Sequence, residues 1–226
     1  MSANDASPMK SGRGSADQGF SLLEMIVAMG LFSILVIVVI AAIVGFAGSI
    51  KSAKTTIEGA GTNTTIMETM DIQARYADAI NRPGPGGSGA RYIEFEVPKS
   101  STTTGDPGCY QWRYDPSTGV VSQRSWGVSS TNTAVNVSGW ASKGEHIVDQ
   151  GGNAYPFAML PANDAVGILR QRIQVTLITG VNGGKTTQSV VAFAARNSTS
   201  VSVTNGDANG DGQSDTTVCM QAGGRP

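Results

Sequence analysis

Residues 25–50 form an unbroken apolar run without one charged side chain, and a single carboxylate, Glu24, directly precedes it. As a helix rising 1.5 Å per residue, the run spans roughly 39 Å, which exceeds the about 30 Å of hydrocarbon in a bilayer. The chain is therefore predicted to place one helix in a membrane. A carboxylate within an apolar segment is costly unless something neutralises it, so Glu24 is a candidate functional residue.

The residues around the start of this run have the pattern of a processing signal. Gly19 is followed by Phe20, and Glu24 is the fifth residue counted from Phe20. Together with the apolar run, this pattern resembles the N-terminal signal of the type IV pilin and pseudopilin superfamily. The resemblance implies that a prepilin peptidase cleaves after Gly19 and that Phe20 becomes N-methylated. It also implies that subunits pack through their apolar helices into a filament, with Glu24 facing a neighbour's amino terminus.

An ordinary secretory signal is the alternative, because residues 45–47 (Gly-Phe-Ala) offer a small-residue cleavage site. Such a signal has an apolar core of only about 7 to 15 residues, shorter than this run. Lys10 and Arg13 precede the run and Lys51 and Lys54 follow it, so charge alone does not decide the orientation. The superfamily resemblance implies a single-pass protein of the cytoplasmic membrane with its head outside, in a surface pilus or a periplasmic filament after assembly.

The charge balance argues against a nucleic-acid partner. The chain has 16 basic and 17 acidic residues and no basic stripe. Without the leader and the membrane segment 176 residues remain, enough for one domain. The expected division is a leader at 1–19, a transmembrane and assembly helix at 20–50, its amphipathic continuation at 51–82, and a sheet head with a Ser/Thr/Gly-rich tail at 83–226.

Helical periodicity continues beyond the membrane run. Apolar residues at spacings of three and four predict a helix from Lys51 to about Asn81, with a Met and Ala stripe facing the core: Ile66, Met67, Met70, Ala74, Ala77 and Ile80. Asp71 and Arg75 are placed to form an ion pair on this helix. The glycine-containing stretch 58–65 predicts a bend or unwound patch. The proline and glycine residues of 82–89 end the helix.

The period then changes to two, which indicates strands. Residues 92–97 and 109–114 alternate between two faces and predict half-buried strands, and the turn residues 115–119 predict a hairpin into residues 120–126. Residues 172–177 and 189–195 predict a second hairpin through the turn 181–184. The expected fold class is α+β, in which a long N-terminal helix packs on an antiparallel sheet head. This is the layout of pilins.

The likeness extends weakly into the head. Residues 70–80, the aromatic hairpin around Trp112 and residues 194–197 resemble J-type minor pseudopilins and W-type minor pilins. Major pilins often carry a proline midway along the apolar helix, and residues 20–50 contain none. The resemblance implies a minor pilin-like subunit of a type IV pilus or related filament, in its initiation or tip complex. Alternatives are a minor pseudopilin of a type II secretion system and a membrane-anchored adhesin or binding head.

Cys109 and Cys219 are the only cysteines and both lie in the head. Outside the cytoplasm they are expected to form a disulfide, with two free thiols as the alternative. Closing a loop of about 110 residues is worth roughly 4 to 5 kcal/mol in the chain-entropy model. The only histidine, His146, has no cysteine or second histidine near it in sequence for a zinc site, and no nucleophile elbow is present, so we expect no enzymatic activity.

An acidic loop near the C-terminus resembles the first part of a calcium-binding loop. Oxygen-bearing side chains stand at its positions one, three, five and nine, a glycine stands at position six, and position seven offers a backbone carbonyl. The five candidate ligands are Asp207, Asn209, Asp211, Gln213 and Asp215. Position twelve is Val218 instead of the usual bidentate acid. The sequence leaves two hypotheses, a Ca²⁺ site and a solvated acidic turn, and no cofactor is required.

Overall fold

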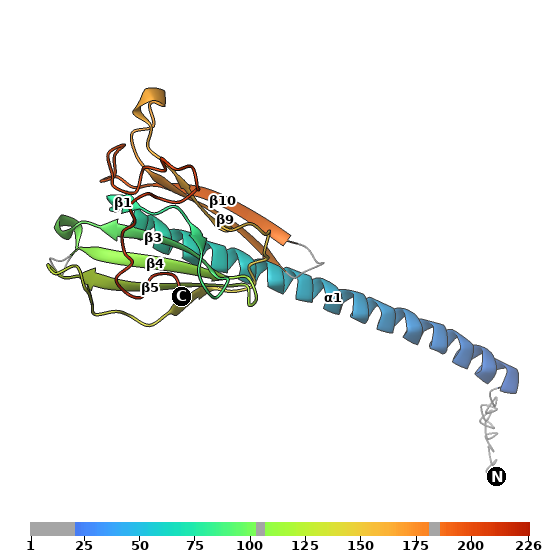
Figure 1. Ribbon diagram of the computed structural model, residues 1–226. Helices are drawn as coiled ribbons and strands as arrows, with labels where there is room; N and C mark the ends of the chain where they lie inside the picture. Colours follow the sequence, from blue (N-terminus) through green and yellow to red (C-terminus); the bar gives the residue numbers. More distant parts are fainter. Residues whose placement is uncertain (1–20, 103–106, 181–185) are drawn as a thin grey trace, which may run out of the picture. The chain divides into compact units, whose positions relative to one another are not determined.

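The computed structural model describes residues 21–102, 107–180 and 186–226 (Figure 1). The chain divides into two compact units, Met1–Ser49 and Ile50–Pro226, and each is described by itself. One α-helix, α1 (Leu22–Ala74), contributes to both units. The second unit contains all of the β-structure of the described residues.

An apolar helix of membrane-spanning length begins in the first unit. Its span, Leu22–Lys51, has 30 residues and the length and composition of a membrane-crossing helix, and its apolar side chains are exposed. The hydroxyls of Ser33 and Ser49 donate to the backbone carbonyls of Met29 and Gly45, at 2.8 and 3.1 Å. These polar groups therefore find partners within the helix, as a hydrocarbon environment requires.

The predicted end of the helix is wrong, and the helix has no unwound patch at residues 58–65. α1 ends at Ala74, and the backbone N–H groups of Asp78 and Asn81 donate to the carbonyls of Glu96 and Glu94 instead (3.0 and 2.9 Å). The chain exchanges helical hydrogen bonds for sheet bonds there. α1 is also unbroken through residues 58–65, because the about 1 kcal/mol that each glycine costs is small against the cooperativity of a long helix.

The first sheet follows the helix and is antiparallel throughout. Its path is β1-β3-β4-β5-β6, with β2 on β3 and β7 on β5. The strands are β1 (Ala79–Ile80), β2 (Gly84–Pro85), β3 (Arg91–Val97), β4 (Gly108–Asp115), β5 (Val120–Val128), β6 (Ala134–Val135) and β7 (Ala141–Gly144). The predicted aromatic hairpin is confirmed as β4–β5, and Asp115 Oδ1 accepts the N–H of Ser117 in its turn at 2.9 Å.

The second sheet has three antiparallel strands in the order β10-β9-β8. They are β8 (Phe157–Leu160), β9 (Arg172–Gly180) and β10 (Thr186–Ala194). The predicted pairing of the second hairpin is confirmed, from Thr186 opposite Gly180 to Ala194 opposite Arg172. The turn predicted at 181–184 lies outside the described residues. Two short 3-10 helices, η1 (Lys99–Ser101) and η2 (Asp164–Val166), complete the head.

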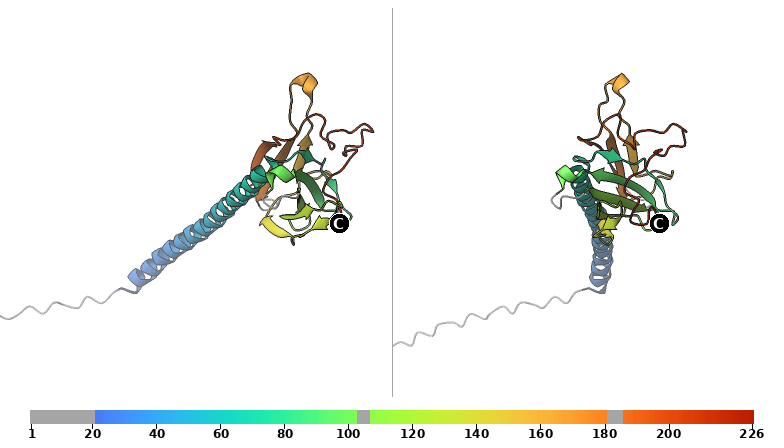
Figure 2. Two further views of the ribbon diagram at one scale, coloured as in Figure 1. Left: turned by 90° about the vertical axis from the view of Figure 1, so that its left-hand side faces the viewer. Right: turned by 60° about the vertical axis from the view of Figure 1, so that its left-hand side comes forward.

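The last turns of α1, residues 63–74, pack against both sheets (Figure 2). Ile66, Met70 and Ala74 are fully buried in one cluster with side chains of β3, β4 and β9, which confirms this part of the predicted apolar stripe. Ala77 and Ile80 are buried in the same cluster but lie beyond the end of the helix. Polar bonds fix the helix on both sides. Asn63 Nδ2 donates to Ser189 Oγ on β10 at 3.1 Å, and the Trp112 indole N–H on β4 donates to Gln73 Oε1 at 3.0 Å.

The opposite face of the first sheet is covered as well, which the alternating pattern did not predict. Tyr92 and Glu94 of β3 were expected at the polar face of a half-buried strand, yet both have no exposed surface. The C-terminal segment crosses β3, β4 and β5 on that face (Figure 1). A segment without periodicity gives no sequence signal of where it packs, so the prediction of half-burial was wrong for β3.

Candidate functional site

The N-terminal residues of the described chain carry the predicted assembly carboxylate. Glu24 lies in the first turn of α1 and is exposed. Its negative charge is favourable near the positive end of the helix dipole. Gly19 and Phe20, the predicted processing junction, lie outside the described residues. The structure thus places an exposed acid at the start of a membrane-length helix, available to a positive group of another chain.

The predicted disulfide is present. Cys109 at the start of β4 is bonded to Cys219 in the C-terminal segment, with 5.4 Å between the Cα atoms. Both cysteines are buried in a small cluster with Trp126 and Val128 of β5. The bond therefore attaches the C-terminal segment to the face of the sheet that lies away from α1.

A buried polar network next to the disulfide was missed by sequence reasoning. Glu94 is fully buried, and its carboxylate accepts hydrogen bonds from Asn81 Nδ2 and Gln111 Nε2 (3.0 Å each) and from Arg225. Asn81 Nδ2 also donates to the carbonyl of Val218 at 2.8 Å, and the N–H of Val218 donates to Asn81 Oδ1 at 2.9 Å. In sequence, Glu94 is one polar residue in an alternating strand, and nothing there marks it as buried.

The predicted calcium loop is closed by its own hydrogen bonds. The N–H of Asp211 donates to Asn209 Oδ1 at 3.1 Å, and the N–H of Gln213 donates to Asp211 Oδ1 at 2.8 Å. Asp215 Oδ2 accepts the N–H of Ala208 at 2.9 Å. The first two are Asx-type turns, in which the side chain stabilises the nearby backbone, and the third ties the two ends of the loop together.

The remaining acid of this loop is engaged elsewhere. Asp207 lies 3.7 Å from Arg82 Nε and forms an ion pair with it. Within the described residues, no group of three or more His, Cys, Asp and Glu is gathered so that it could hold a metal ion. The side chains do not converge as a calcium cage requires. Calcium binding therefore stays a prediction from the sequence pattern.

Two neighbouring carboxyl groups, Asp78 in the segment after α1 and Glu96 on β3, have raised pKa values. Burial raises the pKa of Asp78, against hydrogen bonds from its own and the next backbone N–H. Burial also raises the pKa of Glu96, and the nearby charge of Asp78 adds to this. In contrast, a hydrogen-bonded ion pair with Arg91 lowers the pKa of Asp149. His146 is exposed and has a left-handed backbone conformation, with φ 62°.

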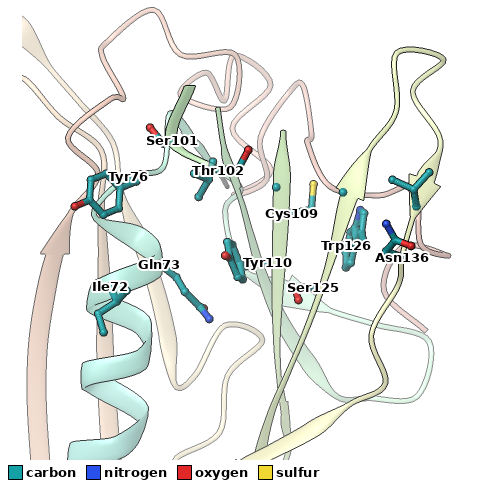
Figure 3. Close-up of a pocket in the computed structure, with 14 residues that line it drawn as sticks. Ile72, Gln73, Tyr76, Ser101, Thr102, Cys109, Tyr110, Ser125, Trp126 and Asn136 are labelled. Carbon is teal, nitrogen blue, oxygen red and sulfur yellow. The ribbon is translucent and has the colours of Figure 1, made fainter. Parts of the chain in front are cut away.

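The head also contains a pocket that sequence reasoning did not predict. It has a volume of about 440 Å³ and lies between the last turns of α1, the segment around η1, and strands β4 to β6 (Figure 3). Ile72, Gln73 and Tyr76 line it from the helix, and Tyr110 and Ser125 line it from the sheet. Because these residues come from distant parts of the sequence, no local motif marks the pocket.

Comparison with known proteins concerns the N-terminal region. Residues 14–46 match the family model described as the prokaryotic N-terminal methylation motif. The chain carries a prepilin-type signal. No curated protein and no solved structure gives a significant match. The prepilin-type signal confirms the resemblance to type IV pilins and pseudopilins, whereas the J-type or W-type assignment of the head stays a prediction.

The prepilin-type signal and the structure are consistent with each other. An apolar N-terminal helix with an antiparallel sheet head is consistent with the pilin-like fold. The matched residues include the Gly19 to Phe20 junction, Glu24 and most of the span Leu22–Lys51. A prepilin-type chain of this kind fits a membrane-anchored protein that later enters a filament.

Proposed function

We propose that this protein is a minor pilin-like structural subunit that prepilin peptidase cleaves between Gly19 and Phe20 and that joins a filament through α1. The observation that carries the proposal is the match to the methylation motif at residues 14–46, continuous with an apolar helix of membrane-spanning length. Cleavage leaves that helix on the protein, so the same segment anchors the subunit first and packs against other subunits afterwards.

The chemistry of Glu24 supports assembly through the helix. A carboxylate in an apolar helix is stabilised by an opposite charge, and the free amino terminus of another processed subunit supplies one. The partners of this protein are then prepilin peptidase, the membrane and other subunits of the same filament. Its head stays on the far side of the membrane from the leader, where Cys109 and Cys219 meet oxidising conditions.

The minor and tip role rests on the absence of proline from residues 20–50 and on the weak likeness of the head. A minor subunit is present at low copy number. Quantitative mass spectrometry of sheared filaments is expected to find this protein far below the most abundant pilin-like subunit. Equal abundance would assign it a major role instead.

Mass spectrometry of the protein from its native membrane tests the processing step. We expect a mature N-terminus at Phe20 carrying an N-methyl group. Gly19→Val is expected to retain the leader, and Gly14→Val, a matched change within the leader, is expected to be cleaved normally. A wild-type chain that begins at Gly48 would overturn the proposal in favour of ordinary secretion.

A further inference from the structure

The pocket at the end of α1 has a floor that is built into the sheet. Val97, Gly108, Gly127 and Val135 pair in one row across β3, β4, β5 and β6. The two central positions have no side chain, although glycine is unfavourable inside a strand. A glycine within a strand often marks a place where a ligand or another chain comes close to the backbone.

An aromatic side chain forms one wall. Tyr110 is half-buried and stacks on the buried ring of Phe95, with the centroids 5.6 Å apart and the planes inclined by 27°. This stacking fixes the orientation of the Tyr110 ring. Tyr76, from the turn after α1, lines the pocket from the helix side and is 50% exposed. The pocket therefore offers aromatic surface from two elements.

A fixed amide adds directed hydrogen bonding. Gln73 Oε1 accepts the indole N–H of Trp112 at 3.0 Å, which orients the amide group. Its side chain extends from α1 toward Tyr110 (Figure 3). The amide NH₂ is a donor, and hydroxyl groups that both donate and accept stand at Ser125 and Tyr110.

The described lining is uncharged. None of the 14 lining residues that the structure describes is Asp, Glu, Lys, Arg or His. An ion that entered would lose hydration without meeting an opposite charge from these residues. A purely apolar ligand would leave the amide and hydroxyl groups without partners, which is also costly. The lining favours a neutral ligand that has both an apolar face and a rim of hydroxyl groups.

We propose that this pocket binds a neutral saccharide unit. The C–H face of a sugar ring packs on an aromatic ring, and its hydroxyls pair with amide and hydroxyl groups of the kind that line the pocket. The volume of about 440 Å³ lies within the usual range of small-molecule sites. This inference goes beyond the proposed function and does not depend on filament assembly.

Titration of the full-length protein in micelles of a detergent without a sugar headgroup tests the inference. The probes are glucose, galactose, mannose, N-acetylglucosamine and lactose, followed by saturation-transfer NMR and tryptophan fluorescence. Because Trp126 lines the pocket and Trp112 is hydrogen-bonded to Gln73, a bound ligand is expected to change the tryptophan emission. We expect saturable binding of at least one of these sugars.

Variants locate the binding. Gly127→Val puts a side chain on the glycine row and is expected to raise Kd at least about tenfold. Tyr110→Phe keeps the ring, removes the hydroxyl and is expected to raise Kd by about fivefold. Gly139→Val is the matched control, because a Cβ at Gly139 meets open space and Gly139 is not among the lining residues. It is expected to leave Kd unchanged.

The proposal is overturned if no sugar binds, or if Gly139→Val weakens binding as much as Gly127→Val. Binding of an uncharged peptide in the absence of any sugar binding would also overturn it, by assigning the pocket to a protein partner. If Gly127→Val lowers Tm, Tyr76→Ala replaces it, because this exposed side chain is removable without loss of core packing. An unchanged Kd in Tyr76→Ala and Tyr110→Phe together would place the sugar elsewhere.

Discussion

Arg225 donates two hydrogen bonds to the carboxylate of Glu94, from Nε to Oε1 at 2.9 Å and from Nη2 to Oε2 at 2.7 Å. The two residues are 131 positions apart, and the Glu94 side chain has no exposed surface. The pair therefore joins the end of the chain to the central part of the first sheet. With the disulfide at Cys219, it holds the C-terminal segment over β3 and β4.

Replacement of Glu94 by glutamine is expected to destabilise the head by about 3 to 5 kcal/mol, because it leaves the guanidinium of Arg225 buried without an opposite charge. Denaturant unfolding of wild type and variant measures the difference. Asp71→Asn is the control, since it breaks the more exposed helical pair of Asp71 with Arg75, worth about 0.3 to 0.5 kcal/mol. Equal losses in the two variants would contradict the assigned importance of Glu94.

Removal of the disulfide by Cys109→Ser together with Cys219→Ser is expected to lower the free energy of unfolding by roughly 4 to 5 kcal/mol, less any relief of strain. The reason is the 110-residue loop that the bond closes, which restricts the unfolded chain. Denaturant titration of the variant gives this value, and reduction of the wild type provides an independent measurement. A midpoint that does not move would show that the Arg225 to Glu94 pair alone holds the segment.

Asp78→Asn is expected to raise Tm at pH 7. Burial raises the pKa of Asp78 above 3.8, so the folded state favours the protonated form. The contribution of the protonated Asp78 to the stability of the folded state is complete below pH 3.8. It is lost as the pH rises through the folded-state pKa. Asparagine stays neutral at every pH, so the gain of the variant is expected to disappear in acid.

Asp149→Asn provides the control of opposite sign. The hydrogen bond with Arg91 lowers the pKa of the Asp149 carboxyl group from 3.8. The ionised carboxylate therefore stabilises the folded state above pH 3.8, and this stabilisation is lost as the pH falls through the folded-state pKa. This variant is expected to have a lower Tm than wild type at pH 7 and the same Tm in acid. If the Tm difference from wild type changed with pH in the same direction for both variants, the two assigned pKa shifts would be refuted.

Glu24→Ala is expected to be cleaved and to remain in the membrane, yet to be recovered poorly in sheared filaments. The substitution removes the charge that would meet a neighbouring amino terminus, whereas it makes insertion of the helix more favourable. Immunoblots of membrane and filament fractions measure the ratio. Normal recovery in filaments would show that Glu24 has no part in assembly.

The acidic loop is expected to keep its shape without calcium, because its side-chain oxygens accept backbone N–H groups within the loop. A chelator is therefore expected to leave Tm of the full-length protein unchanged. Asp211→Ala is expected to cost about 1 kcal/mol with or without added calcium, for the lost hydrogen bonds. A calcium-dependent rise in Tm that Asp211→Ala abolishes would instead establish the ligands predicted from the sequence.

Local patterns in the sequence were sufficient to predict several elements of the structure. The uninterrupted apolar run predicted a membrane-length helix, since helix length and hydropathy are local properties. Alternation with period two and the turn residues 115–119 predicted the β4–β5 hairpin, because both strands and their turn are contiguous. The two cysteines predicted the disulfide, since no other thiol was available.

Only the tertiary structure decided the features that join distant segments. The helix ends at Ala74 because β3 offers sheet partners to the next residues, which the helical periodicity could not indicate. Glu94 is buried because an aperiodic segment 131 residues away covers it. The pocket combines the end of α1 with β4 to β6. Each feature depends on packing between segments that are far apart in the chain, and local sequence patterns do not indicate such packing.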